Sequence, residues 1–288
     1  MVWRLNVEEH VDPLPGPRAV IGEGPSFDAA RDTLWWFDIP SGRLFEHRFA
    51  DRQTVMHELP FMASALARID DERQLLCTEN GFFIRTIATG ELQQHQPLEA
   101  DDTSTRSNDA RTHVSGAFWV STMHKAAEAE CGSIYWYRKG EVRKLFDRLT
   151  VPNSICFSPD GERAYFSDTR KSTVYTVALD AETGLPQGEP GIFIEDIQGP
   201  DGAVVDSLGN IYIARWGGSR ISVFSADGIQ VQDIPVPTAQ PTCPVFIGHD
   251  FGRLATTTAS VNRNDETAGS TFVLPGRVKG ISDPAVVL

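Results

Sequence analysis

Residues 152–169, PNSICFSPDGERAYFSDT, contain the pattern that decides the fold. The apolar run SICFS is followed by the turn PDGE and then by a second strand, RAYFSDT. Short runs rich in β-branched and aromatic residues, separated by Gly, Asn, Asp and Pro, are typical of antiparallel β-strands. A similar stretch, PDGAVVDSLGNIYIARWGG, follows at residues 200–218. The chain therefore repeats one strand–turn–strand unit.

The repeated unit can be placed six times along the chain, with a spacing of roughly 40 to 48 residues. This period is that of β-propeller blades of about four strands. No long segment shows the apolar period of a helix. We predict an all-β fold, in which one six-bladed β-propeller with four-stranded antiparallel blades forms a single domain over residues 1–288. The six copies begin near Pro25, Ala65, Asp109, Ser154, Gly202 and Pro244.

The two ends of the chain are expected to close the ring. The N-terminal segment VWRLNVEE and the C-terminal segment SDPAVVL both have the composition of strands. We expect these two segments to share one blade, because their pairing would remove the unpaired strand edges at the point of closure.

Charge and composition argue against several classes of function. The net charge of −13 disfavours a nucleic-acid partner, because phosphate binding requires clustered Lys and Arg. The sequence contains no run of about 18 apolar residues, the length that a membrane-spanning helix requires. The N-terminus lacks the apolar core of a signal peptide, so we expect a cytoplasmic protein. The four cysteines form no C-x-x-C pair and indicate neither a disulfide framework nor a zinc ribbon.

A polar residue precedes a turn glycine by the same distance in three of the copies. The separation is eight positions, and the pairs are Asn108 and Gly116, Asn153 and Gly161, and Asp201 and Gly209. A fourth copy places Glu23 in a similar position. Because equivalent positions on the innermost strands of a propeller meet near its axis, we expect these side chains to converge. The remaining blades would contribute Ser64 and either Thr242 or Cys243.

Two carboxylates and two amides that converge at one end of a channel form an oxygen cage for a hard divalent cation. Taken singly, each of these residues is more often a turn residue than a ligand. Their common position within the repeat favours a metal site over separate turn residues. Water in the coordination positions that no residue fills would make such a site suitable for catalysis. Ca²⁺ is the expected ion, and Zn²⁺, Mn²⁺, Mg²⁺ and Fe²⁺ are alternatives.

Four segments resemble the signature segments of the SMP-30/gluconolactonase/regucalcin family. They are GEGPSFD at 22–28, RSNDARTHVSGAFWVSTM at 106–123, PNSICFSPDGERAYFSDT at 152–169 and PDGAVVDSLGNIYIARWGG at 200–218. The similarity runs over nearly the whole chain, in the same order. It implies a six-bladed propeller that binds one divalent metal ion in its channel and hydrolyses sugar lactones.

The same resemblance implies roles for five residues. Glu23, Asn153 and Asp201 match the metal ligands of the family. Asp201 also matches the residue that acts there as general base. Arg106 and Asn108 match the residues that bind the substrate.

Two departures from the family pattern bear on the substrate. His124 and Lys125 stand where the family often has an acidic residue, and Ala110 stands where it has a glycine after Asn-Asp. The segment at His124 and Lys125 is expected to cover the channel mouth, where its cations would favour a lactone bearing a carboxylate, phosphate or sulfonate. A solvated loop is the alternative, because exposed charges usually signify no more.

We predict a metal-dependent sugar lactonase, a carboxylic ester hydrolase that converts a gluconolactone-like aldonolactone to the aldonic acid in carbohydrate metabolism. The metal ion would polarise the lactone carbonyl, and Asp201 would take the proton from the attacking water. The expected partner is a small-molecule sugar lactone, with no nucleic acid and no membrane, and the oligomeric state is left open. The alternatives are a promiscuous esterase or organophosphate hydrolase, and a non-catalytic calcium-binding propeller.

Overall fold

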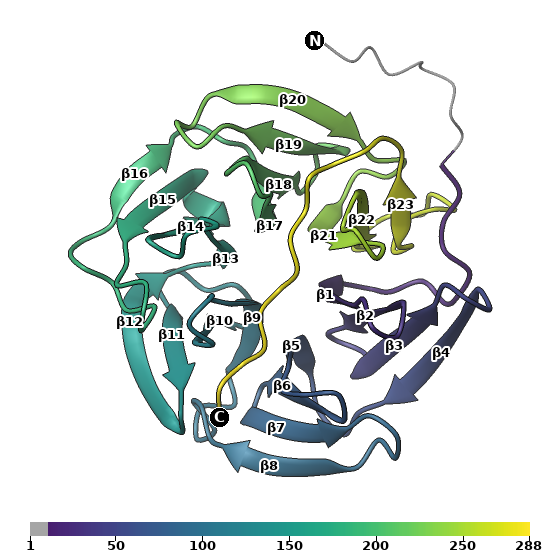
Figure 1. Cartoon of the computed structure of the whole chain (residues 1–288), viewed down its shortest axis with the longest axis horizontal. Coiled ribbons are helices and arrows are strands. Elements are labelled where there is room, and N and C mark those ends of the chain that lie inside the picture. The colour runs from purple at the N-terminus through teal and green to yellow at the C-terminus, as the bar shows by residue number, and fades with distance from the viewer. Residues whose placement is uncertain (1–10) are drawn as a thin grey trace.

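The computed structural model describes residues 11–288, which form six β-sheets arranged in a ring (Figure 1). Within these residues the helical structure is limited to η1, a 3₁₀ turn at Thr169–Lys171. The helical structure among residues 11–288 lacks the length and hydrophobicity of a transmembrane helix. The prediction of an all-β, six-bladed propeller is confirmed.

The first five blades are four-stranded antiparallel meanders in chain order. The first blade contains β1 (Gly22–Asp28), β2 (Thr33–Asp38), β3 (Arg43–Arg48) and β4 (Gln53–Glu58). The second contains β5 (Ala63–Arg68), β6 (Arg73–Thr78), β7 (Gly81–Thr86) and β8 (Leu92–Gln96). The third contains β9 (Thr105–Thr112), β10 (Phe118–His124), β11 (Gly132–Arg138) and β12 (Glu141–Leu149). The fourth contains β13 (Pro152–Phe157), β14 (Arg163–Asp168), β15 (Thr173–Ala178) and β16 (Gly191–Ile194). The fifth contains β17 (Pro200–Val205), β18 (Ile211–Arg215), β19 (Arg220–Phe224) and β20 (Gln230–Pro235).

The sixth blade pairs three strands, β21 (Pro241–Ile247), β22 (Arg253–Thr258) and β23 (Phe272–Leu274). At its outer edge Pro13 forms an antiparallel bridge with Phe272, and the backbone N–H of Leu14 donates to the carbonyl oxygen of Thr271 at 2.8 Å. The chain near its N-terminus therefore does reach the closing blade. The segment VWRLNVEE, for which pairing was expected, lies outside the described residues.

The expectation for the C-terminal segment SDPAVVL is wrong. Residues 281–288, here called the C-terminal strap, form no strand and run across one face of the ring (Figure 1). The strap ends on the second and third blades, where the N–H of Val286 donates to Arg68 and that of Val287 donates to Gly116. Asp283 forms an ion pair with Arg111 on β9, and Val286 is buried in an apolar cluster. These contacts hold the strap over the axis and away from the sixth blade.

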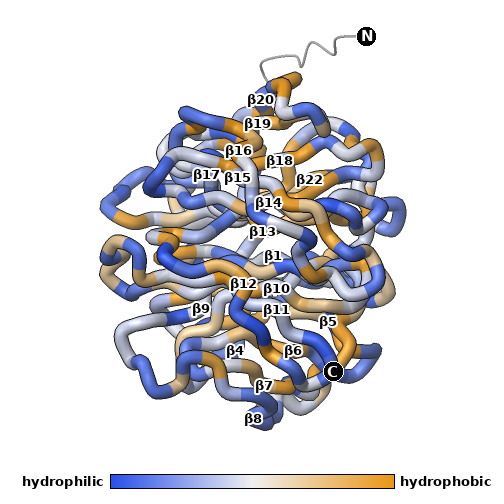
Figure 2. Tube along the Cα trace, turned by 90° about the vertical axis from the view of Figure 1, so that its left-hand side faces the viewer, coloured by the Kyte–Doolittle hydropathy of each residue, from blue (hydrophilic) through white to orange (hydrophobic). Residues whose placement is uncertain are grey.

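Every junction between neighbouring blades is filled by one apolar cluster, six in all. One cluster joins the last blade to the first and packs Val245 and Ala255 against Leu34 and Trp36. Hydrophobic segments lie along the strands, while many turns at the outside are hydrophilic (Figure 2). The burial of apolar side chains between blades therefore closes the ring.

All six predicted repeat starts lie on the innermost strands, which are β1, β5, β9, β13, β17 and β21. These strands contact one another in order around the axis. The repeat phase in the sequence therefore corresponds to a position in space.

Candidate metal centre and active site

The innermost strand of each blade contains an irregularity near its start. The pairing between this strand and the second strand shifts register there in all six blades. A β-bulge of this kind bends the strand and changes the direction of a side chain. Six buried polar residues occupy the equivalent positions at these irregularities: Glu23, Ser64, Asn108, Asn153, Asp201 and Thr242.

Three of the predicted site residues form a chain of hydrogen bonds. The Nη1 of Arg106 donates to the Oδ1 of Asn108 at 2.9 Å. The Nδ2 of Asn108 donates to the Oδ1 of Asn153 at 2.6 Å, and the Nδ2 of Asn153 donates to Thr169 at 2.9 Å. These bonds fix both amide groups, so the amide oxygen of Asn153 is held in one orientation.

Glu23 and Asp201 bring two buried carboxylates to the same place. Burial raises the pKa of Glu23 to about 8, with a further contribution from the negative charge of Asp109. Burial also raises the pKa of Asp201 well above its ordinary value, and here the charge of Glu23 adds to the effect. The guanidinium of Arg106 opposes both shifts, and burial lowers its own pKa to about 10. One cation of charge two at this position would neutralise both carboxylates.

The donor set fits a hard divalent cation. Two carboxylates and one amide oxygen, contributed by Glu23, Asp201 and Asn153, are ligands of the kind that Ca²⁺ and Mg²⁺ prefer. They come from β1, β17 and β13, three separate innermost strands. Among residues 11–288, no group of three or more His, Cys, Asp or Glu side chains could hold a metal ion. A candidate centre among these residues therefore needs ligands beyond those four residue types, and the amide oxygen of Asn153 is one.

Ser64 and Thr242 occupy equivalent positions but join neighbouring blades. The hydroxyl of Ser64 donates to that of Ser107 at 2.7 Å, and the hydroxyl of Thr242 donates to the carbonyl oxygen of Gly22. The strand register places Thr242, and not Cys243, at the position equivalent to Asp201. These two hydroxyls are therefore engaged in holding the ring together.

Sequence reasoning assigned no role to two further residues near the axis, Asp109 and Arg111. The carboxylate of Asp109 accepts hydrogen bonds from the N–H of Ile155 at 2.7 Å and of Ala110 at 2.9 Å. Burial raises its pKa to about 6. Arg111 donates to the carbonyl oxygen of Ala203 at 3.1 Å. Two charged residues at alternate positions of an innermost strand were the signal that could have identified them.

The segment at His124 and Lys125 is tied to its surroundings. The ammonium of Lys125 lies 2.7 Å from a carboxylate oxygen of Glu79 and donates to the carbonyl oxygen of Thr103 at 2.9 Å. His124 lies 3.8 Å from a carboxylate oxygen of Glu128. Because a carboxylate already accompanies each of these residues, their charges do not form an unpaired cationic patch. His124 is the last residue of β10 and Lys125 begins the turn that follows, so this segment is a paired strand end and turn.

The fold and the buried oxygen-rich centre define a class, the six-bladed propellers with polar residues gathered at the axis. The sequence pattern described as the SMP-30/Gluconolactonase/LRE-like region matches residues 21–260. The chain belongs to this family.

Individual relatives are similar over nearly their full lengths. A protein of Rhizobium meliloti named as a candidate sugar lactone lactonase is 41 % identical, with 92 % of this chain and 93 % of the relative covered. A pentonolactonase of Haloferax volcanii is 32 % identical, with 86 % and 87 % covered. The crystal structure of a calcium-binding protein, regucalcin, from Agrobacterium tumefaciens has a TM-score of 0.94 and 44 % identity, and covers 96 % of this chain and 97 % of its own.

Proposed function

We propose that this protein hydrolyses a sugar lactone, a gluconolactone-like aldonolactone, to the aldonic acid. One observation carries the proposal: in a family with named lactonases among its members, Glu23, Asn153 and Asp201 lie next to the hydrogen-bonded pair of Arg106 and Asn108. The first three offer oxygen ligands, and the pair offers the remaining N–H donors of Arg106 and the amide oxygen of Asn108, groups of the kind that orient a polyol.

A divalent cation would be held by Glu23, Asn153 and Asp201. When bound, it would supply Lewis-acid polarisation of a carbonyl and a lowered pKa of water. Ca²⁺ is the first candidate, because the donors are all oxygen atoms and the similar structure from Agrobacterium tumefaciens is described as calcium-binding. Mn²⁺, Mg²⁺, Zn²⁺ and Fe²⁺ are the alternatives to be tested against it.

Residues of the protein itself would carry out the proton transfer and orient the substrate. The carboxylate of Asp201 takes the proton from the attacking water and returns it to the ring oxygen as the ester bond breaks. Arg106 and Asn108 hold the hydroxyl groups of the sugar, so that the carbonyl carbon stays within reach of the water. Asn108 and Asp201 are buried and Arg106 is partly buried, which limits the competition of bulk water for these hydrogen bonds.

The second candidate function is calcium binding without catalysis. The description of the Agrobacterium tumefaciens structure as a calcium-binding protein favours it. The same three oxygen ligands would serve both functions. The pair of Arg106 and Asn108 separates the two candidates, because a calcium-binding protein has no need of polyol-binding donors beside its ion.

The test is a pH-stat assay of acid release from a panel of aldonolactones of five- and six-membered rings. We expect at least one lactone to be opened far faster than the metal-only background. Excess chelator should remove this activity, and added Ca²⁺ should restore it. If no lactone is opened above background while Ca²⁺ still binds, the calcium-binding candidate replaces the lactonase.

A further inference from the structure

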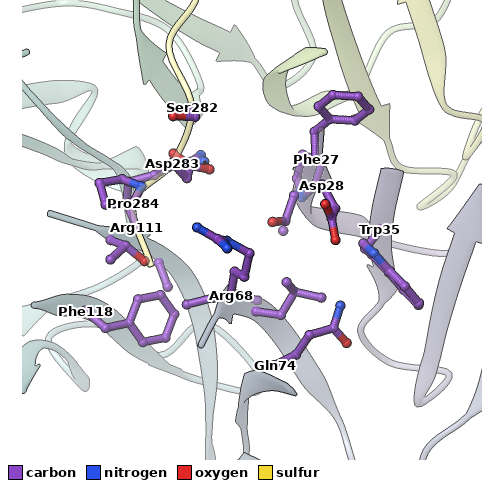
Figure 3. Close-up of a pocket in the computed structure, with 18 of the residues that line it drawn as sticks. Phe27, Asp28, Trp35, Arg68, Gln74, Arg111, Phe118, Ser282, Asp283 and Pro284 are labelled. Atoms are coloured by element: carbon purple, nitrogen blue, oxygen red, sulfur yellow. Dashed lines mark hydrogen bonds and ion pairs between the residues drawn. The ribbon is translucent and has the colours of Figure 1, made fainter. Parts of the chain in front are cut away.

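A cavity of about 230 Å³ lies beneath the C-terminal strap (Figure 3). The ends of β1, β5 and β9 and strap residues 282–284 line it. Glu23, Asn153 and Asp201 lie near the opposite ends of their strands and do not line this cavity. The far cavity, as we call it here, therefore contains none of the three candidate metal ligands and borders the candidate metal centre at Gly24 and Cys243.

Four aromatic residues contribute to the walls of the far cavity: Phe27, Trp35 and Phe118, which Figure 3 labels, and Phe251. The Trp35 side chain is only 1 % exposed, and its ring stacks on His57 with the ring centres 6.0 Å apart. The guanidinium of Arg85 lies 5.2 Å from the centre of the Trp35 ring. These contacts fix the indole, so the apolar wall exists before any ligand binds.

The two carboxylates of the far cavity already have cationic partners. Asp28 accepts from the Nη1 of Arg31 at 2.8 Å and also from the backbone N–H of Arg31. Asp283 accepts from the Nη1 of Arg111 at 2.9 Å. Neither carboxylate is available to attract a cationic ligand, because its charge is matched by an adjacent arginine.

The hydrogen-bond donors of the far cavity are in excess. Arg68 reaches toward the middle of the cavity in Figure 3, and the carboxylate nearest to it belongs to Asp71, 3.6 Å away and 82 % exposed. The Nε1 of Trp35 and the Nε of Arg111 are buried and have no hydrogen-bond partner among residues 11–288. In Figure 3 the indole nitrogen is on the side of the ring that faces Asp28 and the cavity.

We propose that the far cavity binds a small organic acid. Its carboxylate would accept hydrogen bonds from Arg68, while its carbon skeleton would lie against Phe27 and Phe118, close enough to the buried Trp35 indole to perturb it. An anion is favoured because the weakly paired guanidinium of Arg68 remains after both carboxylates are matched, and because the buried N–H groups of Trp35 and Arg111 add positive potential to the wall. The proposal does not depend on lactone hydrolysis.

The experiment is a titration of the ¹⁵N-labelled protein with benzoate, followed by NMR at the Trp35 indole N–H. Benzamide has the same shape without the charge and serves as the matched probe. We expect benzoate to move the Trp35 signal in a saturable way, and benzamide to bind at least about tenfold more weakly. The Arg68→Gln variant should lose at least about tenfold in benzoate affinity. The Arg163→Gln variant, altered at an exposed arginine outside the far cavity, should keep the affinity of the parent protein.

The titration is carried out in excess chelator and then with Ca²⁺ present. Binding that persists in chelator supports the far cavity, because a carboxylate bound at the candidate metal centre would be lost. Equal affinities for benzoate and benzamide, unchanged affinity in Arg68→Gln, or a signal that chelator abolishes would each overturn the proposal. Failure of lactone hydrolysis would leave these readouts unchanged.

Discussion

At the scale of single residues, Asp201 combines two roles in the proposed reaction, as a ligand and as the acceptor of a proton. The Asp201→Asn variant keeps the size of the side chain but removes its charge and basicity. We expect kcat on the best aldonolactone to fall by about 10²- to 10⁴-fold. The control is Asp227→Asn, which alters an exposed carboxylate in a turn of the same blade and should leave kcat unchanged. Near-normal turnover by Asp201→Asn with metal present would rule the assignment out.

Arg106 should affect the substrate without helping to hold the metal ion. Its guanidinium donates to Asn108 and to the carbonyl oxygen of Ser107, and its charge lies near Glu23 and Asp201. The Arg106→Met variant should lower kcat/KM by about tenfold or more, as expected for the loss of charged hydrogen bonds. Calcium affinity, measured by titration calorimetry, should not fall, because a cation has been removed from beside the ion. A parallel loss of calcium affinity would show that Arg106 supports the centre itself.

At the scale of elements, the bulges of the innermost strands determine where the site residues point. Gly24 follows Glu23 with a φ of 54°, and a Cβ there would lie only 2.0 Å from the carbonyl oxygen of Ser64. Gly217 has a φ of 78°, and a Cβ there would have nothing within 4 Å. An alanine at Gly217 would therefore cost only the unfavourable backbone conformation, whereas an alanine at Gly24 would add a steric collision.

We expect Gly217→Ala to lower the free energy of unfolding by about 1 kcal/mol, and Gly24→Ala to lower it by more than about 3 kcal/mol. The collision with Ser64 should also displace Glu23 and weaken calcium binding in the Gly24→Ala variant only. Denaturant unfolding and calorimetry measure the two effects. Equal stability of the two variants would contradict the role given to the first bulge.

The element scale also shows what the sequence could predict. Glu23, Asn108, Asn153 and Asp201 could be placed together because a repeat converts a shared phase into a shared position. The C-terminal strap could not be predicted, because it belongs to no repeat and is held by single contacts such as the ion pair of Asp283 with Arg111. The apolar residues of SDPAVVL reflect burial of Val286 in the cluster between the second and third blades, and not pairing as a strand.

At the scale of the whole molecule, the candidate centre joins distant parts of one ring. Glu23, Asn153 and Asp201 belong to the first, fourth and fifth blades, and burial raises the pKa of both carboxylates. A cation bound to all three would therefore stabilise the folded ring against the unfolded chain. At a Ca²⁺ concentration about 100 times the Kd, mass action contributes about 2.7 kcal/mol.

Chelator should consequently lower Tm by roughly 5 °C or more relative to Ca²⁺-saturated protein, given about 2–4 °C per kcal/mol for a chain of this size. Differential scanning calorimetry measures the shift. The Asp201→Asn variant should show a much smaller difference between the two conditions, whereas Asp227→Asn should behave as the parent protein. An unchanged Tm of the parent protein on addition of chelator would contradict this prediction.

The ring itself was predictable from roughly equal repeats, but its chemistry required the register of the strands. The sequence left Thr242 and Cys243 as alternatives, and the position of the bulge in β21 distinguished them. Asp109 and Arg111 escaped notice because their burial depends on contacts with other segments, such as Ile155 and Ala203. From the sequence alone, charged residues on a short strand are expected to be exposed, and their burial becomes evident only when the neighbouring segments are placed.

The most direct test of the central claim is an anomalous difference map from crystals of the protein soaked in Mn²⁺. The account predicts one strong peak at the axis, within bonding distance of oxygen atoms of Glu23, Asn153 and Asp201. No peak there, or a peak bound only by surface carboxylates, would contradict it.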